Sequence, residues 1–248
     1  MTSNHFFIPK GECEGGRAVL RGAEGRHFRK VLRGRPGDEI WLFDEDGVRY
    51  RARVESLSAE EVLCALLERE EPREVGTRIT LGQALLKAKA MDWVVRKAAE
   101  FGAETVAPLT SARSVARVPP DAGRKAGRWT RIVREAAKQS RTAHPPVIEP
   151  PRALEEFLTT CRVPSRVVLS ERGGARLRET LETIASGNEG RPPSDAVLLI
   201  GPEGGWSDRE EDAFTDHGFL RASLGRTTLR AETAAVAALA IVAHEWKW

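Results

Sequence analysis

The sequence is poor in cysteine and has neither a long apolar run nor a metal-binding pattern. The three cysteines among its 248 residues (Cys13, Cys64 and Cys161) lie far apart and form no CxxC or Cys/His arrangement. We therefore expect buried thiols and no bound metal. No apolar run approaches the roughly 18 residues of a membrane-spanning helix, and the first residues lack the apolar core of a secretory signal. These absences predict a soluble, cytoplasmic protein.

Several common catalytic motifs are also missing. The chain has no GxxxxGK[ST] phosphate loop and no GxSxG nucleophile elbow. Gly201, Gly204 and Gly205 do not have the GxGxxG spacing of a dinucleotide site, and the five histidines do not cluster. These absences argue against a P-loop NTPase, a Rossmann dehydrogenase and a kinase.

The net charge of +3 conceals two basic segments. Residues 17–35 contain seven Lys or Arg and one Glu, and residues 112–141 contain nine Lys or Arg and two acids. Such a local surplus suits a polyanion, and binding of this kind weakens as salt rises. A solvated helix face has the same composition, so nucleic-acid binding is one of two interpretations at this point.

The first part of the chain is rich in predicted β-structure. A hairpin is expected around a turn at Gly47, and its second strand alternates apolar residues with Arg49, Arg51 and Arg53. This pattern predicts a small barrel with a basic outer stripe over residues 1–72. The elements expected there are a helix at 24–32 and strands at 39–43, 48–54 and 61–67.

A charged, proline-containing segment at 68–74 is the expected linker to a region with a different pattern of secondary structure. Short apolar strands now alternate with amphipathic helices, which predicts an α/β domain over residues 73–248 with a mostly parallel sheet covered on both faces. The strands expected are 79–85, 105–109, 167–169, 196–200 and 220–224. The helices expected are 91–101, 127–141, 176–184, 208–217 and 231–246.

Two loops at strand ends, each passing into a helix, are the strongest indication of a ligand site. In the first, an apolar strand runs into the glycine-rich segment 201–205, and Ser207 with Glu210 predicts a helix capping box. A loop without side chains lets the backbone approach a flat ligand closely. An ordinary tight turn has the same composition, so both interpretations stay open.

The second loop runs from Ser223 to Arg230 and opens an alanine-rich helix. Leu224 and Leu229 can enclose an aromatic ring. A charged Arg230 beside an apolar helix needs a partner, because burial of an unpaired charge is costly. Either Arg230 and Glu232 act on a ligand, or they form a surface ion pair of little consequence.

Taken in order, these segments resemble the RsmE family, the 16S ribosomal RNA uridine N3-methyltransferases of the SPOUT superfamily. The resemblance rests first on the runs 200–205, 224–225 and 229–234, and it extends over nearly the whole chain. Residues 27–33 and 37–38 are similar to the family's N-terminal PUA-like module. Matches to its first two catalytic-domain helices are Lys87, 91–93, 97–102, 128–129 and 135–140. The run Ser170-Glu171-Arg172 departs from the pattern, which leaves the role of Ser170 open.

The resemblance implies a PUA-like RNA-binding β-barrel followed by a SPOUT methyltransferase domain with a C-terminal trefoil knot, an exception to the rule that folds are unknotted. It implies S-adenosylmethionine as cofactor, a homodimer, and 16S rRNA or the small ribosomal subunit as partner. The cofactor-binding residues implied are Leu169, Ile200, Gly201, Pro202, Glu203, Gly204, Gly205, Leu224, Gly225, Leu229 and Thr233. The RNA-binding residues implied are Arg26, His27, Arg29, Lys30, Arg33, Arg49 and Arg51.

The implied activity is methylation of uridine N3, and charge indicates which residues matter. Negative charge develops on N3 and the flanking carbonyl oxygens as the imide proton leaves, so a fixed cation lowers the barrier. We expect Arg230 to be that cation. Glu232 is expected to orient Arg230 or accept the proton, with Glu203 as the competing base. Two alternatives stay open: another SPOUT methyltransferase acting on a ribose 2′-oxygen or a tRNA, and a non-catalytic RNA-binding or ribosome assembly factor.

Overall fold

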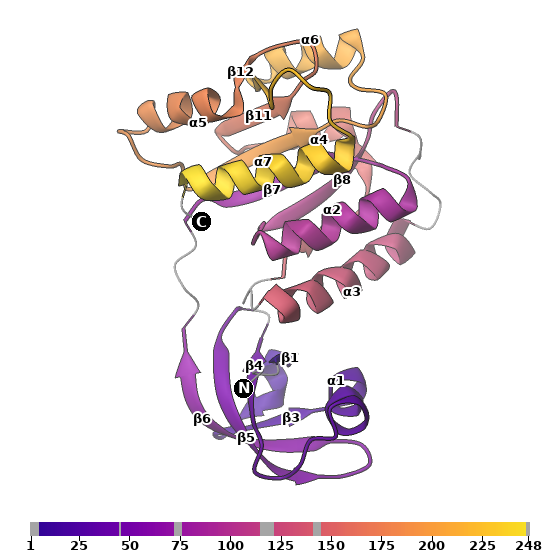
Figure 1. Ribbon diagram of the computed structural model, residues 1–248, viewed down its shortest axis with the longest axis vertical. Coiled ribbons are helices and arrows are strands. Elements are labelled where there is room, and N and C mark those ends of the chain that lie inside the picture. Colours follow the sequence, from indigo (N-terminus) through magenta and orange to yellow (C-terminus); the bar gives the residue numbers. More distant parts are fainter. Residues whose placement is uncertain (1–4, 45, 72–75, 115–121, 141–144, 247–248) are drawn as a thin grey trace. The chain divides into compact units, whose positions relative to one another are not determined.

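The computed structural model describes residues 5–44, 46–71, 76–114, 122–140 and 145–246. The chain divides into two compact units, Met1–Glu74 with Ala137–Pro145 and Val75–Ala136 with Pro146–Trp248. Each unit has its own β-sheet (Figure 1).

The first unit is built on a six-stranded sheet with the order β1-β4-β5-β6-β3-β2. The expected hairpin is confirmed, because β4 and β5 pair antiparallel with Ile40 opposite Ala52, and β6 continues the meander. The apolar side chains of the second hairpin strand are buried, as the alternation predicts. The strands are β1 (His5–Phe7), β2 (Cys13–Glu14), β3 (Arg17–Leu20), β4 (Glu39–Phe43), β5 (Arg49–Leu57) and β6 (Val62–Glu70).

The short helix expected at 24–32 is present but changes its hydrogen-bonding pattern partway. It consists of α1 (Gly22–Arg26) and a π-helix, η2 (His27–Val31), and a 3₁₀-helix, η1 (Lys10–Glu12), precedes them. Phe28 anchors η2 in the core, with its ring edge-on to Phe6 at a centroid distance of 5.7 Å. The basic segment 17–35 also contains the strand β3, which was not predicted because the segment was distinguished only by its charge.

The second unit contains an eight-stranded sheet whose strand pairs are all parallel. Its order is β10-β8-β7-β13-β11-β14-β12, with β9 beside β8. The five expected strands are confirmed, whereas β9, β10 and β12 are too short to give a periodic pattern. The strands are β7 (Arg78–Ala84), β8 (Thr105–Thr110), β9 (Val147–Ile148), β10 (Arg152–Ala153), β11 (Ser165–Leu169), β12 (Ala175–Arg176), β13 (Asp195–Ile200) and β14 (Leu220–Ser223).

Helices cover this sheet on both faces, as expected. Alternate residues of β13 belong to different apolar clusters: Leu198 and Ile200 pack with α2, α3, α5 and α7, whereas Val197 and Leu199 pack with α4 and α6. A parallel strand buried on both faces explains its continuous apolar run. The helices are α2 (Ala88–Glu100), α3 (Ala122–Ser140), α4 (Leu154–Thr160), α5 (Leu177–Ser186), α6 (Asp208–Asp216) and α7 (Ala231–Trp246).

Two helices differ from the expectation. Helix α3 begins at Ala122 rather than near Gly127, and α4 was not predicted. A single glycine lowers helix stability by only about 1 kcal/mol relative to alanine, so it need not mark a helix end. Helix α4 is seven residues long, and its apolar residues Leu154, Phe157 and Leu158 span barely two turns.

Candidate active site

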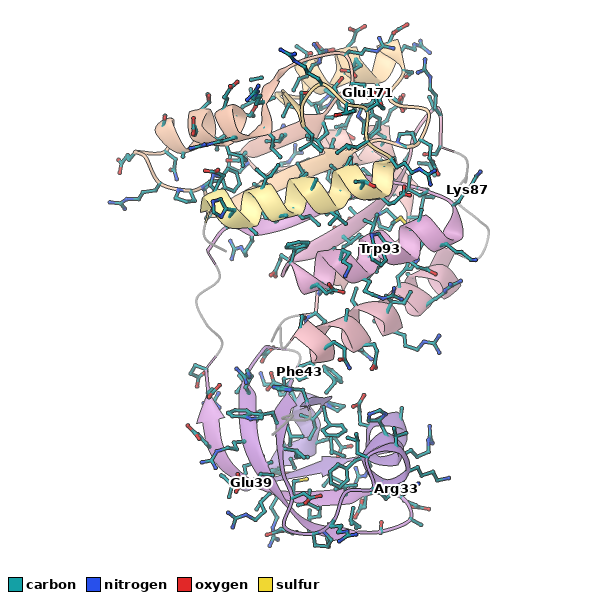
Figure 2. All side chains as sticks on the ribbon, viewed as in Figure 1. Arg33, Glu39, Phe43, Lys87, Trp93 and Glu171 are labelled. Carbon is teal, nitrogen blue, oxygen red and sulfur yellow. The ribbon has the colours of Figure 1, made fainter. Side chains whose placement is uncertain are left out.

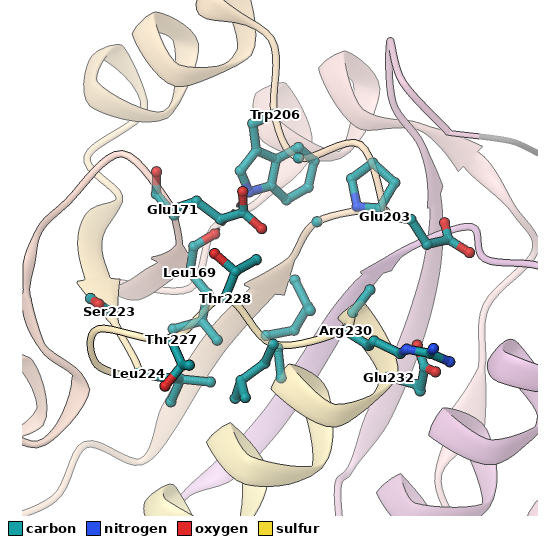
Figure 3. Close-up of a pocket in the computed structure, with 18 of the residues that line it drawn as sticks. Leu169, Glu171, Glu203, Trp206, Ser223, Leu224, Thr227, Thr228, Arg230 and Glu232 are labelled. Carbon is teal, nitrogen blue, oxygen red and sulfur yellow. Dashed lines mark hydrogen bonds between the residues drawn. The ribbon is translucent and has the colours of Figure 1, made fainter.

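The carboxyl ends of three parallel strands meet at one edge of the second sheet. Strand β11 lies between β13 and β14, and the three strands end at Leu169, Ile200 and Ser223. The loops that follow, together with the starts of α2 and α7, enclose a pocket of about 1190 Å³ (Figure 3). Of the expected cofactor residues, the pocket is lined by Leu169, Ile200, Gly201, Pro202, Glu203, Gly205, Leu224, Gly225 and Leu229.

The two remaining expected cofactor residues lie outside this lining. The carbonyl oxygen of Gly204 accepts a hydrogen bond from Nη1 of Arg113 at 3.1 Å, and a Cβ at Gly204 would lie 3.2 Å from the Arg113 side chain. Thr233 is exposed on α7. Sequence reasoning counted both as part of a contiguous motif, whereas the backbone turns each one away from the pocket.

Trp206 ties the glycine-rich loop to the end of β11. Its indole N–H donates to the carbonyl oxygen of Leu169 at 2.9 Å, and its ring packs edge-on against Phe214 at a centroid distance of 4.9 Å. A Cβ at Gly201 would lie 3.2 Å from this indole, and Gly205 has a φ of +67° that side chains disfavour. The glycines therefore serve a close approach and a left-handed turn.

The capping box that follows this loop is confirmed. The Ser207 Oγ accepts from the Glu210 amide, and the Ser207 amide donates to Glu210 Oε2 at 2.7 Å. These bonds fix the start of α6 directly after the glycine-rich loop, so the loop is held between a strand end and a capped helix.

The second loop is also held locally. The Gly225 amide donates to the Ser223 Oγ at 3.2 Å, which closes a small turn at the end of β14, and Gly225 has a φ of +127°. The loop then carries Leu224 and Leu229 into the pocket lining, and Leu229 keeps 36% of its surface exposed. Apolar side chains left accessible in a pocket favour a flat, partly apolar ligand.

Three charged side chains, those of Arg230, Glu232 and Glu203, line the pocket. In Figure 3 they lie on one side of the pocket, and Glu171, Ser223 and Leu224 lie on the other. Within the part of the chain that the structure describes, the Arg230 guanidinium has no ion pair or hydrogen bond to Glu232 or to any other side chain. The geometry therefore does not support the idle surface pair, and Arg230 is left available to a ligand.

Ser170, whose role the sequence left open, belongs to a buried network behind the pocket. Its hydroxyl donates to Glu211 Oε1 at 2.6 Å and accepts from the Arg172 amide at 3.1 Å. Glu211 is only 5% exposed, and its Oε2 lies 3.0 Å from Nε of Arg221. The network joins the loop after β11 to α6 and β14, so it sets the position of Leu169 and Glu171 in the pocket wall.

Several lining residues were absent from the expected site. Lys89 and Trp93 come from α2, Lys87 is the residue just before that helix, and Glu171 and Arg226 come from the two flanking loops. Figure 2 labels Lys87 and Trp93. The segment around Lys87 and Trp93 did match the resembling family, and that match was the one available signal, because nothing in a helical pattern distinguishes a pocket wall from a solvated face.

The expected RNA-binding residues fall into two groups. Those of α1, of η2 and of the turn just after η2 lie on the surface, with only Arg29 partly buried: Arg26, His27, Arg29, Lys30 and Arg33. The arginines expected as a basic outer stripe do alternate with the buried residues of β5, but neighbouring strands supply matching acids. Arg49 pairs with Glu70 at 3.3 Å, and Arg51 pairs with Glu39 at 3.2 Å and Glu68 at 3.0 Å.

Arg53 also pairs with Glu39, at 3.0 Å. Hydrogen bonds from Arg53 and Arg51 hold the pKa of Glu39 below its ordinary value, so this carboxylate stays charged and the stripe stays compensated.

Within the described residues, no group of three or more His, Cys, Asp or Glu is placed to hold a metal ion. No helix in that same part is long and apolar enough to span a membrane.

Comparison with known proteins covers both units. A family model described as an RNA methyltransferase domain matches residues 73–243, and one described as an RNA methyltransferase PUA domain matches residues 20–67. The ribosomal RNA small subunit methyltransferase E of Aquifex aeolicus is 33% identical, with 96% of this chain and 98% of that protein covered. The protein of the same name from Bacillus subtilis is 28% identical, with 91% and 89% covered.

Solved structures of methyltransferases are similar to this chain over nearly its whole length. The ribosomal RNA small subunit methyltransferase E of Neisseria gonorrhoeae, bound to S-adenosylmethionine, superposes with a TM-score of 0.86 at 29% identity, covering 98% of each chain. A methyltransferase from Legionella pneumophila, in complex with the same cofactor, superposes with a TM-score of 0.87 at 29% identity, again covering 98% of each chain.

Proposed function

Since the chain belongs to the ribosomal RNA small subunit methyltransferase E family, we propose that it transfers a methyl group from S-adenosylmethionine to N3 of a uridine in 16S ribosomal RNA. The observation that carries this proposal is the pocket at three adjacent strand ends, lined by an arginine, Arg230, whose side chain has no partner among the described residues. A pocket of this size can take a cofactor and a nucleobase, and we assign to Arg230 the stabilisation of the charge that develops on the base.

The residues present fit the cofactor. Leu169, Leu224 and Leu229 offer an apolar wall for a flat ring, and the glycine backbones at 201, 205 and 225 leave room for close approach. The carboxylates of Glu171 and Glu203 line the same pocket and suit a ligand that carries a sulfonium cation. The cofactor supplies a methyl group that is already activated for transfer.

The pocket's own charges account for the remaining chemistry. Arg230 stabilises the negative charge that develops on N3 and the adjacent carbonyl oxygens, because a preorganised cation costs no reorganisation during reaction. Glu232 lies beside it at the start of α7 and orients the guanidinium or accepts the imide proton, with Glu203 as the competing base. Holding both reactants in one pocket supplies much of the remaining acceleration.

The finer architecture belongs to the same proposal. Residues 1–72 form a PUA-like barrel, and residues 73–248 form a SPOUT domain whose C-terminal segment makes a trefoil knot and a homodimer interface. This is supported by the path of the chain, which runs from β13 past β11 to β14 and then returns as α7 to pack on α2, α5 and β13. Equilibrium sedimentation tests the dimer directly, since a monomer at micromolar concentration contradicts it.

RNA recognition is assigned to the first unit. The exposed residues Arg26, His27 and Lys30 of α1 and η2, with Arg33 just after η2, contact backbone phosphates. The arginines of β5 contribute less, because acidic neighbours already pair with them. Contacts of this kind make affinity depend steeply on salt.

Product analysis tests the proposed function. Purified protein is incubated with methyl-labelled S-adenosylmethionine and unmethylated small-subunit particles, and the RNA is then digested to nucleosides. Label in N3-methyluridine is the expected result. Label in a 2′-O-methylated nucleoside, label only when tRNA is the substrate, or cofactor binding without transfer would each contradict the proposal.

A further inference from the structure

A large aromatic side chain is left uncovered in the pocket wall. Trp93 lies on α2 with 45% of its surface exposed, although Met91, Val94 and Val95 on the same helix are almost completely buried. The apolar face of α2 is thus complete without Trp93. The Lys97 ammonium lies 4.7 Å from the centroid of the indole ring and covers part of it, while Trp93 still contributes to the pocket lining.

The pocket has room for a second ligand beside the cofactor. Its volume of about 1190 Å³ exceeds the range of about 300–1,000 Å³ typical of sites for one small molecule. Glu171 from the loop after β11 and Leu224 from the loop after β14 lie at one end of the pocket, away from Arg230. Helix α2 packs against α7, the helix that Arg230 precedes, so Trp93 and Arg230 belong to neighbouring walls of the same pocket.

Two lysines extend this wall. Lys87 and Lys89 are both exposed and both line the pocket, and neither has a side-chain partner in the described part of the chain. Their place at the start of α2, whose first turn has no acidic residue, is unfavourable to the helix dipole. Helix stability therefore does not account for them, whereas an anionic ligand at the pocket mouth would.

We propose that Trp93 is the surface on which the target uracil stacks, and that Lys87 and Lys89 hold the RNA phosphates beside it. This inference rests on the proposed function and names how the substrate is held. A base must leave its stack before an enzyme can act on its ring, and single-stranded bases are commonly held against aromatic side chains. Stacking orients the uracil plane and leaves its N3 edge free for Arg230 and the methyl donor.

The test compares Trp93→Leu, which keeps an apolar side chain, with Trp93→Phe, which keeps an aromatic face. KM and kcat are measured with unmethylated small-subunit particles, S-adenosylhomocysteine affinity by calorimetry, and oligomeric state by sedimentation. Trp93→Leu should raise the KM for the particles roughly 5- to 150-fold, the loss expected for one stacked base. Trp93→Phe should recover most of that loss, and neither variant should change cofactor affinity or oligomeric state.

The lysines are tested by salt dependence. Lys87→Ala with Lys89→Ala should lower the slope of log affinity against log salt by roughly 1–2, whereas Arg96→Ala, an exposed cation on α2 outside the pocket lining, should leave it unchanged. An unchanged slope would remove the lysines from the proposal.

The outcomes separate this inference from the function on which it rests. If the wild-type protein makes no N3-methyluridine, the proposed function fails. If the wild type is active and Trp93→Leu keeps a normal KM, loses cofactor affinity or dissociates, stacking is overturned while the function stands. Dissociation would instead identify Trp93 as part of a contact between two copies of the chain.

Discussion

The charges of β5 and those of the pocket contrast sharply. On β5, Arg51 meets Glu39 and Glu68 across the sheet, and each charge is compensated by a neighbour. In the pocket, Arg230, Glu203 and Glu232 all contribute to the lining, yet Arg230 forms no ion pair within the described residues. The contrast shows that the number of charges in a segment says little about binding, because only charges without protein partners are free to bind a ligand.

The largest effect is expected from substitution of Arg230, the pocket arginine that has no partner among the described residues. Arg230→Ala should lower turnover by roughly a hundred- to a thousandfold, the cost of losing one preorganised partner of the transition-state charge. Arg230→Lys should recover little if a planar fork must reach two acceptors. Single-turnover methylation at saturating cofactor and RNA is the measurement.

A melting curve and Arg209→Ala, an exposed arginine of α6 outside the pocket lining, serve as controls for that experiment. A folded Arg230→Ala protein with near-normal turnover would remove Arg230 from the mechanism. Loss of thermal stability to the same degree in Arg230→Ala and Glu232→Ala would indicate a structural role for both.

The buried network behind the pocket should give a smaller effect that includes stability. Ser170→Ala removes a hydrogen bond to the buried Glu211 carboxylate, and a bond to a charged group typically contributes about 1.5–3 kcal/mol. We expect a lower urea midpoint together with weaker S-adenosylhomocysteine binding, because the wall at Leu169 and Glu171 loses its support. Unchanged cofactor affinity in a destabilised protein would separate the network from the pocket.

The two adjacent glycines of the first loop allow a matched test. Gly205→Ala places a side chain at a φ of +67°, which costs about 1–2 kcal/mol and should weaken cofactor binding roughly tenfold. Gly204→Ala needs no positive φ and places its Cβ 3.2 Å from the Cβ of Arg113, outside the pocket lining, so its effect on cofactor affinity should be much smaller. Calorimetry on both variants decides the matter, and equal losses would contradict the geometry.

The smallest effects are expected on the first unit, where the comparison can be sharpened. Lys30→Ala should reduce the salt slope of RNA binding by about 1, as expected for one phosphate contact. Arg51→Ala should change RNA affinity less, because Glu39 and Glu68 already neutralise its charge. Titration of both variants with the same RNA at several salt concentrations tests this, and a larger loss for Arg51→Ala would overturn it.

The long elements and the glycine-rich loops could be predicted from the sequence because their signals are local. Hydrophobic alternation predicted β5, continuous apolar runs predicted β4 and β13, and the capping box at Ser207 predicted the start of α6. Partners far apart in the chain could not be predicted. Arg51 reads as a free cation until strand pairing brings Glu39 and Glu68 beside it, and Ser170 has no evident role until Glu211 approaches from α6.

The exposure of Trp93 on α2 is a second feature that could not be predicted from the sequence. Trp93 fits an amphipathic helix pattern equally well as a core residue, a surface residue or a ligand contact. Its exposure is decided by the packing of α2 against the sheet, which leaves the Trp93 side of the helix facing the pocket. Only the assembled fold distinguishes these cases.

The contact between Ser170 and Glu211 also restricts how this protein can change over generations. A mutation that made position 170 apolar would leave a buried carboxylate with Arg221 as its remaining described side-chain partner, and loss of Glu211 would leave the buried Ser170 hydroxyl without its acceptor. Each single step is harmful, whereas the two together can be neutral. Positions 170 and 211 should therefore be inherited as a pair, and in a family tree their substitutions should fall on the same branches.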